Sequence, residues 1–145
     1  MKFLDSLQPL GLLILRIALG IIFFTHGYPK LMKPNVDMQH VFVQHGLPAQ
    51  FVYVAGVLEA FGGLLLVLGL FTRPAALLLA VEMGVAIWKM HSSGGIMAVH
   101  VYEFPLALAA GCSALATVGA GLISVDESIL GSGGRRSRAP RKVKD

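Results

Sequence analysis

The feature that most constrains this chain is an apolar run of twenty-one residues, Phe51 to Phe71, which contains a single charged residue, Glu59. At ~1.5 Å per residue, a helix of this length reaches ~31 Å, which matches the hydrocarbon thickness of a bilayer. Small residues stand about one helical turn on either side of the carboxylate: Ala55, Gly56, Gly62 and Gly63. Helices approach closely where residues are small, so Glu59 is expected on a packing face, where a buried acid needs a partner.

The composition indicates that lipid covers the chain. Of its 145 residues, 55% are hydrophobic and only 14% are charged, which is more apolar surface than a soluble domain of this size could bury. We predict one membrane domain, residues 1–130, followed by a basic tail, residues 131–145. The chain has a net charge of +4, and its basic residues are concentrated in that tail, which is rich in Gly, Ser, Arg and Lys. The tail is expected to be disordered, and nucleic-acid binding is not expected.

The sequence predicts an all-α bundle of four transmembrane helices. The expected spans cover residues 10–26, 51–71, 74–90 and 103–125. Gly27 and Pro29 are expected to end the first span, and the short connection at Thr72–Pro74 makes the second and third spans antiparallel. Residues 30–50 are mixed in polarity and suit a short amphipathic helix at the interface. In the last span, Gly111 and neighbouring alanines offer another close-packing face.

The basic residues of the loops predict how the bundle is oriented. With four spans, one side of the membrane carries eight basic residues: Lys2, Arg73 and six in the tail. The other side carries three: Lys30, Lys33 and Lys89. Because cytoplasmic loops are enriched in Lys and Arg, both termini are expected in the cytoplasm.

Charged residues inside the predicted spans are the candidates for function. Counted from the cytoplasmic edge, helical rise places Arg16 ~9 Å deep, Glu82 ~12 Å, Glu59 ~18 Å and His26 ~24 Å. We therefore expect a ladder that runs from Arg16 through Glu82 and Glu59 to His26 and Glu103. An ionised group near the bilayer centre costs ~3 kcal/mol, which argues that these residues have a purpose.

Two interpretations of this ladder stay open. One arginine cannot neutralise two buried glutamates, so the site is expected to hold one net proton or to bind something cationic or polar. Alternatively, Arg16 and one glutamate form a structural pair that fixes which helices are neighbours. A metal site is not expected, because the spacing of His91, His100 and Glu103 matches no standard pattern. The single cysteine, Cys112, allows neither a disulfide within the chain nor a redox pair.

Four pieces of the chain carry a family resemblance: LRIALGIIFFTHGYPKL (15–31), LEAFGGLLLVLGLFTRPAA (58–76), VHVYEFPLALAA (99–110) and LISVDESI (122–129). In this order they resemble the DoxX family of small bacterial four-helix membrane proteins, over about Leu10 to Ser128. Several residues fall at motif positions of that family: Arg16, His26, Gly27, Lys30, Glu59, Gly63, Gly69, Thr72, Arg73 and Glu103. The resemblance implies a place in the cytoplasmic (inner) membrane. For some members it also implies a link to sulfur oxidation with quinone as acceptor, or to oxidative-stress complexes.

Three functions are consistent with these observations. The first is an accessory subunit of a membrane redox system, which binds a quinone or another small lipophile near Glu59 and works with an oxidoreductase partner. The second is a non-enzymatic scaffold or assembly partner within the lipid bilayer. The third is a proton-coupled small-molecule carrier, which with four spans would need a homo-oligomer. Whether the protein is an enzyme stays open. The candidate ligand-binding residues are Arg16, His26, Lys30, Glu59, Glu82 and Glu103.

Overall fold

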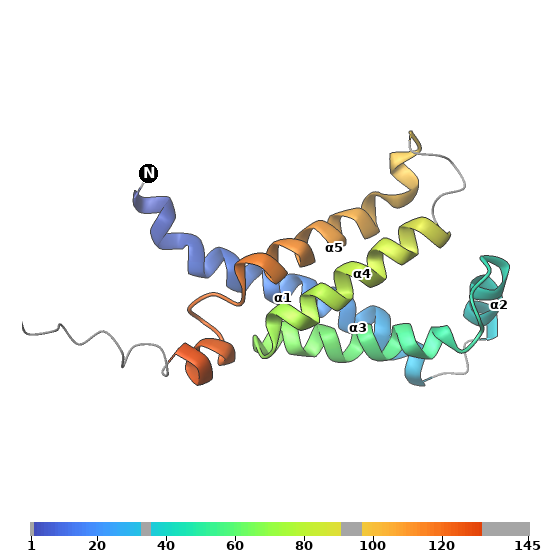
Figure 1. Ribbon diagram of the computed structural model, residues 1–145, viewed down its shortest axis with the longest axis horizontal. Helices are drawn as coiled ribbons and strands as arrows, with labels where there is room; N and C mark the ends of the chain where they lie inside the picture. The colour runs from blue at the N-terminus through green and yellow to red at the C-terminus, as the bar shows by residue number, and fades with distance from the viewer. Residues whose placement is uncertain (1, 33–35, 91–96, 132–145) are drawn as a thin grey trace, which may run out of the picture.

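A computed structural model describes residues 2–32, 36–90 and 97–131 of the chain. Within these residues the secondary structure is helical, which confirms the predicted all-α fold class. The elements are α1 (Lys2–Met32), α2 (Val36–Gln44), α3 (Phe51–Leu68), α4 (Thr72–Met90), α5 (Val99–Val118) and a short π-helical segment, η2 (Glu127–Gly131) (Figure 1). Apart from Gly131, which ends η2, the predicted disordered tail lies outside the described residues.

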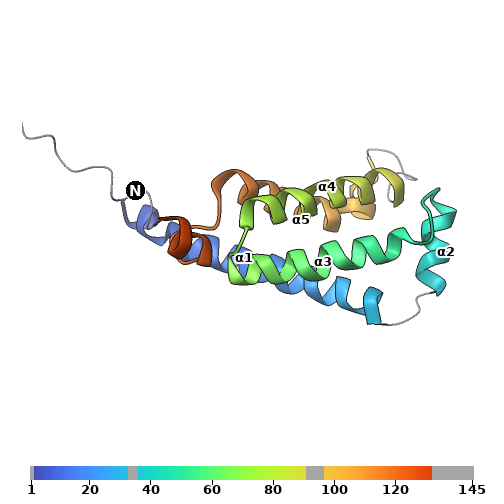
Figure 2. The same ribbon diagram turned by 60° about the horizontal axis from the view of Figure 1, so that its bottom comes forward.

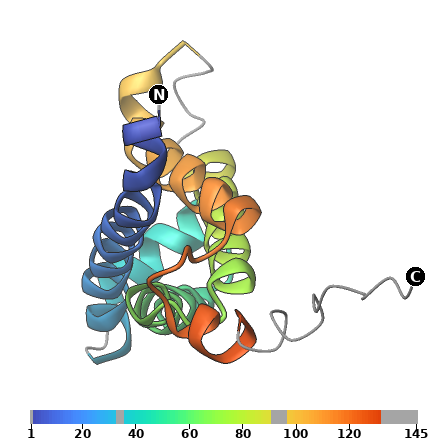
Figure 3. The same cartoon turned by 90° about the vertical axis from the view of Figure 1, so that its left-hand side faces the viewer.

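Four long helices form the bundle. The most extensive contacts join α1 to α3 and α4 to α5, while α3 and α4 contact each other as an antiparallel pair and α1 touches α5 more lightly. Figure 3, which looks along the bundle, shows α1 on one side and the α4–α5 pair on the other, with α3 between them. The short helix α2 lies across the end of the bundle where α3 begins, as Figures 1 and 2 show from two directions.

Three of these helices are long and apolar enough to cross a membrane: Leu4–Met32, Phe51–Leu68 and Val99–Val118. Helix α4 has a similar length, 19 residues, but carries Arg73, Glu82 and Lys89. Its span stays a prediction, which its antiparallel packing against α3 supports.

Large apolar side chains point outward along every long helix. Ile21 of α1 is 54% exposed, Phe61 of α3 is 60% exposed and Val81 of α4 is 58% exposed. Exposed apolar surface of this extent on several helices is expected where lipid, rather than water, surrounds the protein. The bundle is therefore a membrane bundle with a small internal core, made of Leu19, Phe23, Leu66, Ala75, Ala76, Leu79, Met83, Leu108, Cys112 and Leu115.

Glycines bring the backbones of α1 and α3 into direct contact. A Cβ on Gly20 would lie 2.6 Å from the carbonyl oxygen of Gly63, and a Cβ on Gly27 would lie 2.8 Å from that of Gly56. The other two glycines predicted to pack helices face different neighbours: a Cβ on Gly62 would meet Leu79 of α4, and one on Gly111 of α5 would meet Leu19 of α1. Close packing of α1 against α3 fixes which residues of the two helices can meet.

Helix α1 is longer than its predicted span. It begins at Lys2 and continues to Met32 instead of ending near His26, with Pro29 inside it. A proline removes one backbone donor from a helix but does not have to end it when neighbouring helices hold both sides. Gly27, which the sequence predicts to help stop the helix, is instead buried against α3 and extends the close contact between the two helices. This extension moves Lys30 from a predicted loop into the bundle.

Helix α5 differs from its prediction at both ends. It begins at Val99 and ends at Val118, whereas the expected span is 103–125. The end follows from Gly119 and Gly121, which adopt φ values of 94° and 79°. Such values leave the right-handed helix and are readily adopted only by glycine. The residues after Val118 therefore turn back across the end of the bundle.

The glycines where α1 touches α3, which we call the glycine seam, are Gly20, Gly27, Gly56 and Gly63. They predict an effect on stability that depends on position. Gly27→Ala should destabilise the bundle by ~1–3 kcal/mol, because the new methyl group would overlap backbone atoms of α3. Gly84→Ala on α4 is the matched control, since no atom lies within 4 Å of the position that a Cβ would take there, and alanine should be neutral or stabilise by ~0.5–1 kcal/mol. Unfolding of both purified variants in detergent would measure this. Equal stability of the two variants would contradict the close α1–α3 contact.

Candidate functional site

Arg16 lies at the end of the bundle where α3 gives way to α4, and it is 2% exposed. Its Nε donates to the carbonyl of Leu66 at 2.9 Å, and its Nη1 donates to those of Ala120 at 2.7 Å and Ile123 at 3.0 Å. These carbonyls lie near the end of α3 and in the segment after α5. The prediction that Arg16 pairs with Glu82 and Glu59 is therefore wrong. Backbone carbonyls near the end of α3 and in the segment after α5 accept its hydrogen bonds instead.

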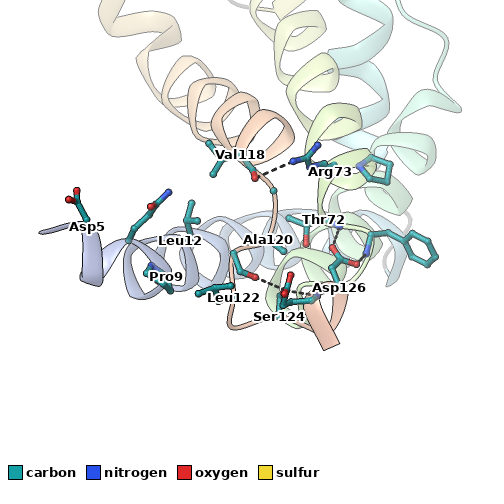
Figure 4. Close-up of a pocket in the computed structure, with 16 residues that line it drawn as sticks. Asp5, Pro9, Leu12, Thr72, Arg73, Val118, Ala120, Leu122, Ser124 and Asp126 are labelled. Atoms are coloured by element: carbon teal, nitrogen blue, oxygen red, sulfur yellow. Dashed lines mark hydrogen bonds between the residues drawn. The ribbon is translucent and has the colours of Figure 1, made fainter. Parts of the chain in front are cut away.

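Asp126 complements Arg16 from the same segment. Its two carboxylate oxygens accept hydrogen bonds from the backbone N–H groups of Phe71 at 2.8 Å and Thr72 at 2.9 Å, at the start of α4 (Figure 4). Its own N–H donates to the carbonyl of Gly69 at 2.9 Å. A carboxylate is favoured at a helix N-terminus, where backbone donors lack partners. The last predicted span ends at residue 125, directly before Asp126, and the capping role of Asp126 was not predicted.

A cavity of about 570 Å³ lies beside this junction, between the start of α1, the α3–α4 turn and the segment after α5 (Figure 4). Much of its polar wall is already engaged, because Asp126 caps α4 and Arg73 donates to the carbonyl of Val118 at 3.3 Å. The hydroxyl oxygen of Thr72 is buried without a hydrogen-bond partner among the described residues. The contacts of Arg16 and Asp126 at this end of the bundle are thus mainly structural, because they hold the turns between the helices in place.

A second charged group lies toward the opposite end, where α2 crosses the bundle. Lys30, in the last turn of α1, forms an ion pair with Glu59 of α3, with 2.5 Å between Nζ and Oε2. Glu59 is only 5% exposed, so a buried acid does find a basic partner on the first helix, but that partner is Lys30 and not Arg16. The pair forms because α1 continues past Gly27 along α3.

Glu82 faces the same region from α4. Its Oε2 is buried and has no hydrogen-bond partner among the residues the structure describes. Glu82 lies eight residues before the end of α4 and Glu59 eight residues after the start of α3, so both are ~12 Å from that end of the bundle. Two carboxyl groups at one level therefore face a single ammonium group.

These three residues line a cavity of about 320 Å³, which we call the charged cavity. The rest of its wall is apolar and comes from α2, α3, α4 and the α2–α3 connection. It consists of Met38, Phe42, Leu47, Phe51, Val54, Ala55, Leu58, Leu78, Val81, Met83, Val85, Ala86 and Met90. The arrangement is typical of small-molecule sites, in which mostly apolar walls hold a few polar groups.

The remaining candidates do not join this group. His26 is exposed on α1, where its Nδ1 lies 2.8 Å from the carbonyl oxygen of Ile22 and its ring lies 5.8 Å from that of Phe104. Glu103 is exposed on α5, and neither residue lines the charged cavity. The predicted ladder does not form: Arg16 lies at one end of the bundle, Glu59 and Glu82 lie toward the other, and His26 and Glu103 belong to neither group. His91 lies outside the described residues, and within them no three His, Cys, Asp or Glu side chains could hold a metal ion.

The sequence contains a signal that could have identified Lys30. Arg16, Gly20, Phe23, Gly27 and Lys30 follow one another at intervals of four and three residues, which places them on one face of a helix. The first four are buried, and the glycines of this face touch α3. Helix α2 contributes Met38 and Phe42 to the cavity, and the sequence signal for this was weaker: the two residues are four apart, which places them on one face of a helix.

Arg16 should be necessary for stability because of its carbonyl contacts. Arg16→Leu would leave three carbonyls without their charged donor, at ~1–3 kcal/mol for each group that stays unsatisfied. Arg73→Leu is the control, since Arg73 is exposed and makes one longer contact. We expect a large loss of folded protein in gel filtration for Arg16→Leu and a small loss for Arg73→Leu. Similar yields and melting temperatures would refute the role of Arg16.

The Lys30–Glu59 pair should show strong coupling in a double-mutant cycle. Lys30→Met should cost ~3–5 kcal/mol, because it leaves a buried carboxylate without its cation. The double variant Lys30→Met/Glu59→Met should recover most of that loss, since neither charge is then buried alone. Unfolding in detergent gives the four free energies. Simple addition of the two single losses would show that the residues do not interact.

Comparison with known proteins agrees with this architecture. The sequence model of the DoxX family matches residues 11–92, from α1 to the end of α4. An uncharacterized protein of Haemophilus influenzae is 39% identical over 94 residues, which cover 65% of this chain and 69% of that protein. The Bacillus subtilis protein named "Putative oxidoreductase CatD" is 34% identical over 99 residues, which cover 68% and 73%.

A relative with longer coverage is a membrane protein by name. "Inner membrane protein YphA" of Escherichia coli is 33% identical over 128 residues, which cover 82% of this chain and 90% of that protein. No solved structure gives a significant match. The apolar helices and the names of these relatives together place the protein in a membrane. Because the family match spans more than half of the chain and a relative above 30% identity is covered almost throughout, this chain belongs to the DoxX family.

Proposed function

We propose that the protein is an accessory subunit of a membrane redox system and that it binds a quinone, or a small lipophile of similar size, in the charged cavity. The observation that carries this proposal is the combination of an apolar wall with an unpartnered acid, Glu82. The volume of the charged cavity, about 320 Å³, lies at the lower end of the range for small-molecule sites. The name of the Bacillus subtilis relative also supports a redox connection.

The residues of the cavity fit the chemistry of a quinone. When bound, a quinone accepts two electrons and two protons as it is reduced. Glu82 can hold a proton in an apolar environment and exchange it, which is the task of a general acid. Lys30 and Glu59 provide a fixed dipole beside it that can orient a polar ring substituent. The single cysteine provides no redox pair, so electrons would come from a partner oxidoreductase.

Two residues near the middle of α1 do not contribute to this site. Arg16 is one of the candidate ligand-binding residues, but its guanidinium binds backbone carbonyls and does not line the charged cavity. Phe23 is 1% exposed in the core of the bundle and does not line the cavity either. Phe42 and Phe51 line the cavity and are the aromatic side chains that could contact a bound ring.

The loop charges extend the proposal to a location. If both termini are cytoplasmic, as the basic residues indicate, the charged cavity lies in the outer half of the inner membrane. Protons exchanged at Glu82 would then come from, or go to, the outer side. The relatives named as inner membrane proteins support this membrane.

Quinone binding can be tested with two substitutions on one helix. Ala55→Phe should fill the cavity and lower the affinity for ubiquinone or menaquinone by at least about tenfold, because a bound ring would lose its space. Val57→Phe adds the same side chain at an exposed position of α3 and should leave the affinity unchanged. Binding is measured by equilibrium dialysis of protein in nanodiscs.

Polar groups are tested in the same assay. Glu59→Gln and Glu82→Gln should each weaken binding, whereas Glu103→Gln, at an exposed acid outside the cavity, should not. Wild-type affinity in Ala55→Phe, or equally weak binding by wild type and Glu59→Gln, would exclude the cavity as a quinone site.

Co-purification from native membranes separates this function from that of a scaffold. A redox subunit should retain one oxidoreductase in stoichiometric amount, whereas a scaffold would retain varied proteins without redox centres. The glycines of the α1–α3 seam are already used inside the bundle, which leaves fewer small-residue faces for other proteins.

A further inference from the structure

The charges around the cavity do not balance. Lys30 is within 2.5 Å of Glu59, so its charge is matched by that carboxylate. Glu82 also lines the cavity, and its buried Oε2 has no hydrogen-bond partner among the described residues. A carboxylate in an apolar environment is stable only if it takes up a proton or acquires a positive neighbour. The cavity therefore has room for one positive charge beside Glu82.

We propose that the charged cavity binds lipophilic organic cations and that each cation displaces one proton from the site. The proposal concerns the same cavity as quinone binding but does not depend on it. Quinone binding uses the protonated form of Glu82 as a donor, whereas a cation binds the ionised form.

The wall of the cavity favours an organic cation. Phe42 and Phe51 line it with aromatic side chains, and the faces of such rings attract cations more strongly when water is excluded. Met38, Met83 and Met90 add flexible and polarisable side chains, which adapt to ligands of irregular shape. Apolar substituents of the ligand would take the place of water against this wall, and the positive charge would take the place of the proton.

The same wall argues against a small inorganic cation. Mg²⁺ and Ca²⁺ need about six or more oxygen ligands to replace their hydration shell. Among the described residues that line the cavity, only Glu59 and Glu82 provide side-chain oxygens, and Glu59 is already paired with Lys30. A bare metal ion would thus lose more hydration than the cavity can replace.

Within the described part of the chain, three titratable groups interact with Glu82. Lys30 of α1, Glu59 of α3 and Cys112 of α5 interact with it electrostatically. The residues of α2 that line the cavity, Met38 and Phe42, carry no charge. Because Lys30 and Glu59 form one pair, displacement of the proton is assigned to Glu82. Proton and cation then compete, so the affinity for the cation should rise with pH and become constant once the site is ionised.

Two aromatic ions of equal size and opposite charge test this directly. Tetraphenylphosphonium should bind to the protein in phosphatidylcholine nanodiscs above the level of empty nanodiscs, and tetraphenylborate should not. Over the pH range in which the site is protonated, the phosphonium affinity should rise about tenfold per pH unit, as one displaced proton requires. A pH indicator in weak buffer should record the release of about one proton per cation. These measurements use the wild-type protein and do not depend on whether variants fold.

Variants then identify the group that binds. Glu82→Gln should lower phosphonium affinity at least about tenfold and abolish its pH dependence, while Glu82→Asp, which restores the charge, should restore both in part. Glu103→Gln removes one acid from an exposed position of α5 and should change neither property. Equal binding of the two aromatic ions, or a pH-independent phosphonium affinity, would overturn the proposal, as would unchanged binding by Glu82→Gln. If quinone binds but the phosphonium does not, only the cation site is refuted; the reverse result refutes only the proposed function.

Discussion

The structure depends on one buried guanidinium. Arg16 joins the end of α3 to the segment that follows α5, through carbonyls that no helix fully satisfies. In lipid such carbonyls have no water to bind, so each must find a donor within the protein. Asp126, from the same segment, caps the start of α4. These two residues therefore fix the turns at one end of the bundle, and the positions of α3 and α4 at the other end follow from them.

Close packing of α1 against α3 transmits this order along the bundle. Arg16 and Lys30 are fourteen residues apart, ~21 Å along the helix, yet they lie on one face. Gly20 and Gly27 lie between them and allow the two backbones to touch. The helix held by Arg16 at one end thus delivers Lys30 to Glu59 at the other. A change that separates α1 from α3 would disturb the charged cavity even if it lay far from it.

Much of this architecture could be predicted from the sequence. The apolar run with Glu59 in its middle identified a membrane helix and an acid that needs a basic partner on another helix. Depth alone could not identify that partner, because helical rise gives a level in the membrane but not the direction in which a side chain points. Gly27 and Pro29 also carried a misleading local signal, since lateral contacts with α3 override their tendency to end a helix. Asp126 could not be placed, because its partners are some fifty-five residues away and meet it only through the glycine turns after α5.

The two charged groups of the bundle differ in a way that bears on function. Around Arg16 the guanidinium Nε and Nη1 and both oxygens of Asp126 have partners within the chain, as a structural role requires. Around Glu59 the charges are unequal. Glu82 adds a second carboxyl group, and the described residues place no second cation beside it. Keeping an unpartnered acid in an apolar cavity reduces stability, and a hydrophobic side chain of similar size would avoid that cost. A proton or a ligand that comes and goes gives the acid a purpose that packing does not, so the charged cavity is where function is to be sought.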